Sequence, residues 1–204
     1  MSTTSTHRPS TVDRVPLLFT IVLGIAAAAY TLVRAVMRVV EVAANRDVPV
    51  VASFADTPAT LPIGPGGAAV EVVAQEVVMR VSDMPAVTVV SLILAEVVYA
   101  GMIVVASVCG VLAVRNIIRG QAFSTANVIL ISTVTVTLGI GFVTHWLFKT
   151  MGANGGASAL AGEPSVNTAF QFDIVTMFGI AALGALAAAF QVGNRIQRET
   201  EGLV

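Results

Sequence analysis

Four long apolar segments constrain the fold of this chain more than any other feature. They cover residues 15–33, 84–114, 126–148 and 174–193, and their only interruptions by an acidic, basic or histidine side chain are Glu96 and His145. A helix of about 20 apolar residues crosses roughly 30 Å of hydrocarbon. Only helices and closed barrels satisfy their backbone in lipid, and these segments lack the two-residue alternation of barrel strands. The sequence therefore predicts an all-α membrane protein whose core is a four-helix transmembrane bundle.

The composition agrees with lipid as the main solvent. Charged residues make up 11% of the 204 residues, whereas soluble domains carry roughly 25%. A net charge of −1 excludes nucleic acid as an expected partner. The single cysteine, Cys109, excludes an intramolecular disulfide and a cysteine-based metal site. No nucleophile, metal or nucleotide motif is present, so we expect no enzymatic activity, no cofactor and no metal.

The apolar segments and the polar stretches between them predict the order of the chain. We expect a disordered cytoplasmic tail (1–14), transmembrane helices over 15–44, 84–119, 126–149 and 173–194, outer segments over 45–83 and 150–172, an inner loop (120–125) and a cytoplasmic tail (195–204). In the first outer segment, a Val-rich stretch ending near Asp83 follows a Pro/Gly cluster. This pattern predicts a β-hairpin with residues 48–54, resting on the helix ends because an isolated hairpin is marginally stable. The second outer segment, rich in Gly, Ala and Ser, predicts a loop.

The arginines predict which side of the membrane each end occupies. The two tails and the inner loop carry six basic residues against three acids, whereas the other side carries five against eight. The positive-inside rule therefore places both termini in the cytoplasm. A cleaved signal peptide is the alternative interpretation of the first segment. It is disfavoured because the apolar stretch exceeds the usual 7–15 residues or so and the helical pattern continues through Arg34, Arg38 and Glu41.

Five charged or titratable residues fall at one predicted depth, near the outer interface. They are Arg34, Arg38, Glu96, His145 and Asp173. One interpretation is a proton or ion site, because ionisable groups in a membrane are functional candidates. The other is an interfacial salt-bridge layer in which Arg34 or Arg38 pairs with Glu96, while His145 pairs with Asp173. Burying charge costs little at the interface, so the sequence favours the salt-bridge layer.

The inner loop is the most distinctive stretch, and its key positions are Arg115, Arg119, Gly120, Phe123, Ser124 and Asn127. Gly120 suits a helix C-terminus and Ser124 suits a helix N-cap. The two arginines complement the helix dipole and an anionic inner leaflet.

The Gly-x-x-Phe-Ser-x-x-Asn pattern of this loop, with the four-helix layout, resembles the DUF2975 family of uncharacterised bacterial membrane proteins. The resemblance implies a bacterial plasma-membrane location and hints at a sensing or regulatory role, because members are often encoded beside small helix-turn-helix regulators.

The sequence leaves two functions open. The first is a non-enzymatic sensor, regulator or accessory subunit that contacts a membrane or cytoplasmic protein. The alternative is a small ion or proton transporter or channel that uses Glu96, His145 and Asp173. The oligomeric state, the partner and any transported species are not predicted by the sequence.

Overall fold

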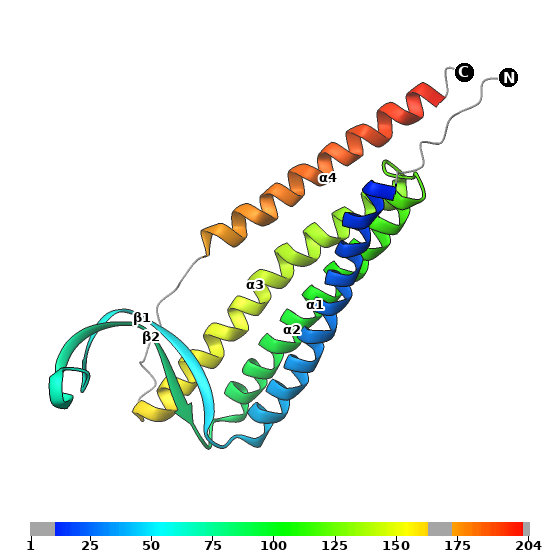
Figure 1. Ribbon diagram of the computed structural model, residues 1–204. Coiled ribbons are helices and arrows are strands. Elements are labelled where there is room, and N and C mark those ends of the chain that lie inside the picture. The colour runs from blue at the N-terminus through cyan, green and yellow to red at the C-terminus, as the bar shows by residue number, and fades with distance from the viewer. Residues whose placement is uncertain (1–10, 163–172, 202–204) are drawn as a thin grey trace. The chain divides into compact units, whose positions relative to one another are not determined.

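The computed structural model describes residues 11–162 and 173–201, most of which form four long helices (Figure 1). The helices are α1 (Thr11–Ala44), α2 (Ala86–Ile118), α3 (Thr125–Ala161) and α4 (Ile174–Glu201). All four are long and apolar enough to cross a membrane, as predicted. The 33 residues of α2 measure about 50 Å at a rise of about 1.5 Å per residue. This length exceeds the roughly 30 Å of a hydrocarbon core, so an upright α2 would extend beyond it.

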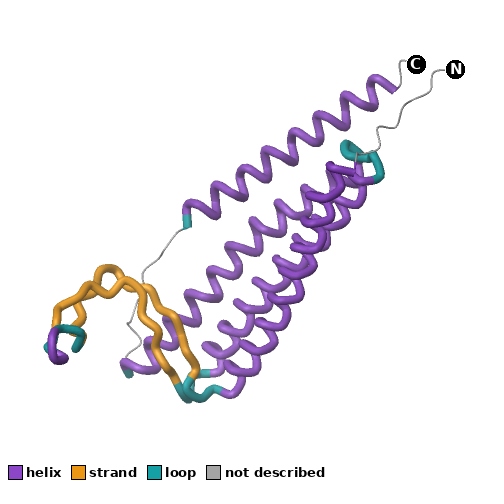
Figure 2. Tube along the Cα trace, viewed as in Figure 1, coloured by secondary structure: helices purple, strands orange, loops and turns teal. Residues whose placement is uncertain are grey.

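The predicted β-hairpin is confirmed and is longer than expected. Strand β1 (Val48–Leu61) pairs antiparallel with β2 (Val70–Val81), and the short helix η1 (Pro65–Gly67) lies at the tip. Figure 2 shows the two strands curving together between the loops at the base and this tip. The register shifts between Ser53 and Thr57, where Asp56 has a positive φ of 43°. The bulge lets β1 continue past residue 54, the predicted end of the strand.

The chain divides into two compact units, and each helix except α4 contributes to both. The loop unit contains the described residues of 11–35, 98–143 and 173–201, and the hairpin unit those of 36–97 and 144–162. The points of division lie within a few residues of all five side chains predicted at one depth. The common depth of these five side chains in a membrane stays a prediction.

The hairpin unit holds the main apolar core. Its fully buried members are Val42 at the end of α1, Val48 and Val50 of β1, and Val81 of β2. Met84 and Leu92 complete the cluster. The base of the hairpin thus packs on helix ends, as the marginal stability of a lone hairpin requires.

Three expected boundaries are wrong. Residues 150–161 were predicted to be loop, but α3 continues to Ala161. Residues 11–14 belong to α1 rather than to a disordered tail, and α4 runs through residue 201 instead of ending at 194. The rest of the predicted N-terminal tail (1–10) and of the outer loop (163–172), together with residues 202–204, lies outside the described residues.

Glycines explain why the end of α3 is helical despite its loop-like composition. A Cβ atom on Gly152 would lie 2.4 Å from Leu92, and one on Gly155 would lie 2.2 Å from Thr88. The missing side chains therefore allow α3 to approach α2 closely, the usual role of small residues between apolar helices. Gly162 then ends the helix at a φ of 70°, and its N–H donates to the Ser158 carbonyl at 3.0 Å.

Candidate functional site

The inner loop begins with a Schellman motif at the end of α2. The Gly120 N–H donates to the Ile117 carbonyl at 2.9 Å, and the Gln121 N–H donates to the Asn116 carbonyl at 3.0 Å. Gly120 has a φ of 79°, a conformation that glycine adopts without steric cost. The predicted role of Gly120 as the helix terminator is confirmed.

Asn127 organises the loop from beneath. Its side chain is fully buried, and its Nδ2 donates to the carbonyls of Gln121 at 3.1 Å and Ala122 at 2.9 Å. Its Oδ1 accepts from Asn116 Nδ2 at 2.9 Å. Both amide hydrogens and the amide oxygen are therefore used. The side chain ties the end of α2, the loop and the start of α3 into one hydrogen-bonded structure.

Ser124 caps α3 as predicted. Its Oγ accepts from the Asn127 N–H at 3.3 Å, the N-cap to N3 bond that satisfies an otherwise unpaired helix donor. Asn127 thus contributes its backbone to the cap and its side chain to the loop.

Phe123 connects the loop to α4, a contact that the sequence did not predict. Its ring lies 5.3 Å from that of Phe190, at an interplanar angle of 40°. A Cβ atom on Gly193 would lie only 2.8 Å from the Phe123 ring. Asn194 adds a hydrogen bond from Nδ2 to Thr125 Oγ1 at 3.2 Å. The sequence signals available in α4 were an aromatic ring, Phe190, and a small residue, Gly193, which lie four and one positions before Asn194.

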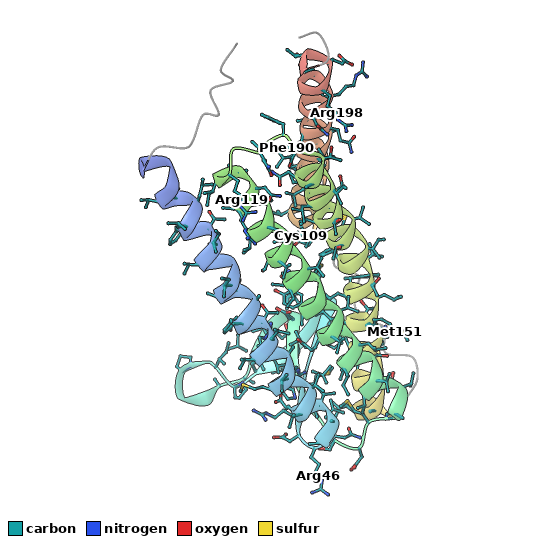
Figure 3. The ribbon with its side chains drawn as sticks, turned by 90° about the vertical axis from the view of Figure 1, so that its right-hand side faces the viewer. Arg46, Cys109, Arg119, Met151, Phe190 and Arg198 are labelled. Atoms are coloured by element: carbon teal, nitrogen blue, oxygen red, sulfur yellow. The ribbon has the colours of Figure 1, made fainter. Side chains whose placement is uncertain are left out.

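The outer surface of the loop is basic. Arg115 and Arg119 are exposed, and neither takes part in an ion pair among the described residues. In Figure 3, Arg119 and Phe190 lie at the same end of the loop unit. The loop and the end of α2 therefore expose two guanidinium groups and, a few residues further along the chain, the ring of Phe123.

The predicted salt bridge of Glu96 with Arg34 or Arg38 is absent among the described residues. Arg38 Nη1 instead pairs with Glu41 Oε2 at 2.7 Å, one helical turn away, and Nη2 donates to the Pro49 carbonyl at 2.6 Å. Within the described part of the chain, neither Glu96 nor Arg34 belongs to an ion pair. Two local acceptors satisfy Arg38, and it anchors the first residues of β1 to α1.

His145 lies next to the backbone beside Glu96. Its Nδ1 is 2.9 Å from the carbonyl oxygen of Ala95, the residue that precedes Glu96. Both His145 and Glu96 are half-buried. His145 therefore contacts the backbone of α2 one residue before Glu96, within the hairpin unit.

Asp173 acts as the N-cap of α4. Its Oδ1 accepts from the N–H groups of Val175 at 3.0 Å and Thr176 at 3.2 Å, and its Oδ2 accepts from the Thr176 hydroxyl. The Thr176 hydroxyl, followed by the backbone donors, lowers the pKa of the Asp173 carboxyl below its ordinary value of 3.8. Pairing of Asp173 with His145 stays a prediction.

A second polar cluster, at the base of the hairpin, was not predicted. Asn45 has a φ of 50°, and its side chain both donates to the Met84 carbonyl and accepts from the Met84 N–H, each at 3.0 Å. The Asp83 N–H donates to the Asn45 carbonyl at 3.1 Å. Arg80 pairs with Asp47 at 2.7 Å across the strands. These bonds hold the two ends of the hairpin together.

Comparisons of the chain with protein-family models, with curated proteins and with solved structures found no match.

Proposed function

We propose that this chain is a multi-pass protein of the bacterial plasma membrane that acts through protein contacts, as a non-enzymatic sensor, regulator or accessory subunit. The observation that carries the proposal is the loop organised by Asn127. A buried amide with all its hydrogen bonds made inside the protein fixes the loop. The exposed arginines and Phe123 then offer a preformed surface, and binding to a preformed surface avoids the entropy of ordering a loop.

The placement in a membrane is supported by the outward faces of the helices. Leu18, Phe19 and Val22 of α1, and Val175 and Phe178 of α4, are each more than half exposed. Apolar rows of this kind are stable against lipid and unfavourable in water.

The orientation rests on charge. With the basic loop and both termini in the cytoplasm, Arg115 and Arg119 face the anionic inner leaflet, which attracts basic side chains by about 1 kcal/mol each. The hairpin then lies outside the cytoplasm, where its core of valines is formed in water. The resemblance to DUF2975 proteins through Gly120, Phe123, Ser124 and Asn127 agrees with this orientation and with a regulatory role.

The proposal is tested by co-purification from native membranes in a mild detergent, followed by mass spectrometry. The expected result is a stoichiometric protein partner that is lost in an Arg115→Ala/Arg119→Ala double variant and kept in an Arg195→Ala/Arg198→Ala control. The control removes two basic residues near the C-terminal end of α4 instead of the loop. Retention of the partner by the loop variant would contradict the proposal.

The second candidate is a small ion or proton transporter, and one observation favours it. Glu96 and His145 are both half-buried, and His145 Nδ1 contacts the carbonyl of Ala95, the residue before Glu96. Protons and cations are carried by such groups in membrane proteins. Purified protein in liposomes should then conduct, and Glu96→Gln should abolish the flux, whereas Glu41→Gln should not. Asp173 is the third residue of this mechanism.

A further inference from the structure

The two edges of the β-hairpin differ in their capacity to accept another strand. Strand β1 carries Pro49 and Pro58, and proline has no N–H to donate to a neighbouring strand. The Pro49 carbonyl already accepts from Arg38 at 2.6 Å. Proline on an edge strand is a common device against edge-to-edge pairing. The outer edge of β1 is therefore closed.

The outer edge of β2 is open. Strand β2 has no proline, and among the described residues no backbone group outside β1 hydrogen-bonds to its backbone. Proline in a sheet occupies positions whose N–H would face outward. Because Pro49 is opposite Arg80 and Pro58 is opposite Val73, the backbone groups of Arg80 and Val73 also face outward in an antiparallel ladder.

In a strand, residues two positions apart direct their backbone groups to the same edge. Val78, two residues from Arg80, and Glu71, two residues from Val73, therefore also face the open edge. Glu71, Val73, Val78 and Arg80 also have exposed side chains, and the two valines are 63% and 62% exposed. These four residues are named the edge set. An open edge with exposed valines is a template for another strand.

The edge set is symmetric about the middle of β2. Reading outward from the point between Gln75 and Glu76, exposure alternates in the same order over five residues in each direction. The symmetry relates Val73 to Val78 and Glu71 to Arg80. The apolar position is therefore matched by an apolar one, and the acidic position by a basic one.

We propose that β2 of one copy pairs antiparallel with β2 of a second copy, which joins two hairpins into a four-stranded sheet. In this register Glu71 of each copy lies opposite Arg80 of the other, and Val73 lies opposite Val78. Four pairs of the edge set exchange about eight backbone hydrogen bonds across the two-fold axis. Opposite charges and branched side chains are favourable cross-strand pairs. The pairing is independent of any partner bound by the inner loop.

Other registers are less favourable. The proposed register pairs the whole strand, because Val70 of each copy lies opposite Val81 of the other. A shift that centres the axis on Glu76 sets two carboxylates directly opposite each other, which is unfavourable. A shift of one residue also moves edge-set residues opposite residues whose backbone faces β1. The Asp47 partner of Arg80 does not block the pairing, because that ion pair uses only Nη1 of a guanidinium with five N–H donors.

Charge reversal tests the proposal on the full-length chain in native-like nanodiscs, with two differently tagged copies. Glu71→Arg and Arg80→Glu should each reduce self-association at least tenfold, because each sets like charges opposite each other. Co-expression of the two variants should restore association, because every pair then has opposite charges. The control is Ile63→Arg, which adds a charge at the exposed hairpin tip, outside both strands, and should leave self-association unchanged. Loss without restoration in the mixed sample would overturn the proposal.

Disulfide trapping tests the register in a Cys109→Ser background. Directly opposite residues have Cα atoms about 5.5 Å apart in a hydrogen-bonded pair, within disulfide range. A mixture of Val73→Cys and Val78→Cys copies should therefore cross-link rapidly. A mixture of Val70→Cys and Val78→Cys copies, three residues out of register, should cross-link at least tenfold more slowly. Any of three results would overturn the proposal. These are equal cross-linking rates in the two mixtures, a monomeric wild-type protein, and cross-linking of Val78→Cys only to a different protein.

Discussion

Replacement of Asn127 by alanine should destabilise the protein by about 2–3 kcal/mol. The substitution removes three side-chain hydrogen bonds, to Gln121, Ala122 and Asn116, and each typically contributes about 1 kcal/mol net. Gln121 is exposed and Ala122 is half-buried, so water can reach their carbonyls. The loss therefore falls near the sum of the three bonds and not at the larger cost of sealed, unsatisfied groups.

Two further substitutions separate the roles of the Asn127 side chain. Asn116→Ala removes one of the three bonds and should cost about 1 kcal/mol. Asn127→Asp keeps the oxygen that accepts from Asn116, but it directs a second oxygen at two carbonyls. Its cost should therefore equal or exceed that of Asn127→Ala. Asn194→Ala, the control, removes an exposed bond of 3.2 Å and should change stability by less than about 0.5 kcal/mol.

The assay is equilibrium unfolding in mixed micelles, combined with hydrogen exchange of the loop amides. Loss of Asn127 should lower both the unfolding midpoint and the protection of the Gly120 and Gln121 N–H groups, which close the Schellman motif. An Asn127→Ala variant within about 0.5 kcal/mol of wild type, with unchanged protection, would refute the role of Asn127 in organising the loop.

Three further predictions concern the contacts of α4 and of the hairpin. The Gly193→Ala variant should lose about 1–3 kcal/mol of stability in micelle unfolding, because its Cβ displaces Phe123. Gly179→Ala, with no neighbouring atom within 4 Å, should instead be neutral or stabilising. Arg38→Ala should lower stability by about 1.5–3 kcal/mol and increase proteolysis of the hairpin. The pKa of the Asp173 carboxyl is depressed, so the carboxylate caps α4 above about pH 4. The cap is lost as the pH falls through the pKa of the folded state, and amide exchange in the first turn of α4 should then accelerate.

The controls define what would contradict each of these three. Equal unfolding midpoints for the two glycine variants would show that Phe123 does not pack against α4. Proteolysis of the hairpin at the wild-type rate in Arg38→Ala would contradict the role of Arg38 as the anchor of β1. Amide exchange with the same pH dependence in Asp173→Asn and wild type would show that the carboxylate does not cap α4.

The sequence predicted the elements whose signals are local. Long apolar segments identified the four helices, and valines around a Pro/Gly turn identified the hairpin. The roles of Gly120 and Ser124 were also predicted, because helix ends depend on the backbone of a few adjacent residues.

The errors occurred where distant contacts override local composition. Residues 150–161 contain three glycines that resemble a loop, but they allow α3 to pack against Thr88 and Leu92. Arg38 was paired with Glu96 from estimated depth alone, whereas a glutamate one turn away and a carbonyl of β1 are its partners. The ring contact of Phe123 joins residues that are far apart in the sequence. Phe190 and Gly193 stand out as an aromatic and a small residue, but a single sequence does not show that they meet Phe123.

The proposed orientation is tested most directly by measuring on which side of the membrane the hairpin and the inner loop lie. Single cysteines at Ile63, near the hairpin tip, and at Gln121, in the loop, are introduced into a Cys109→Ser background; both positions are exposed. We expect a membrane-impermeant maleimide to label Ile63→Cys in intact cells and to label Gln121→Cys only after permeabilisation. Labelling of Gln121→Cys in intact cells, or of both sites equally, would contradict the proposed orientation.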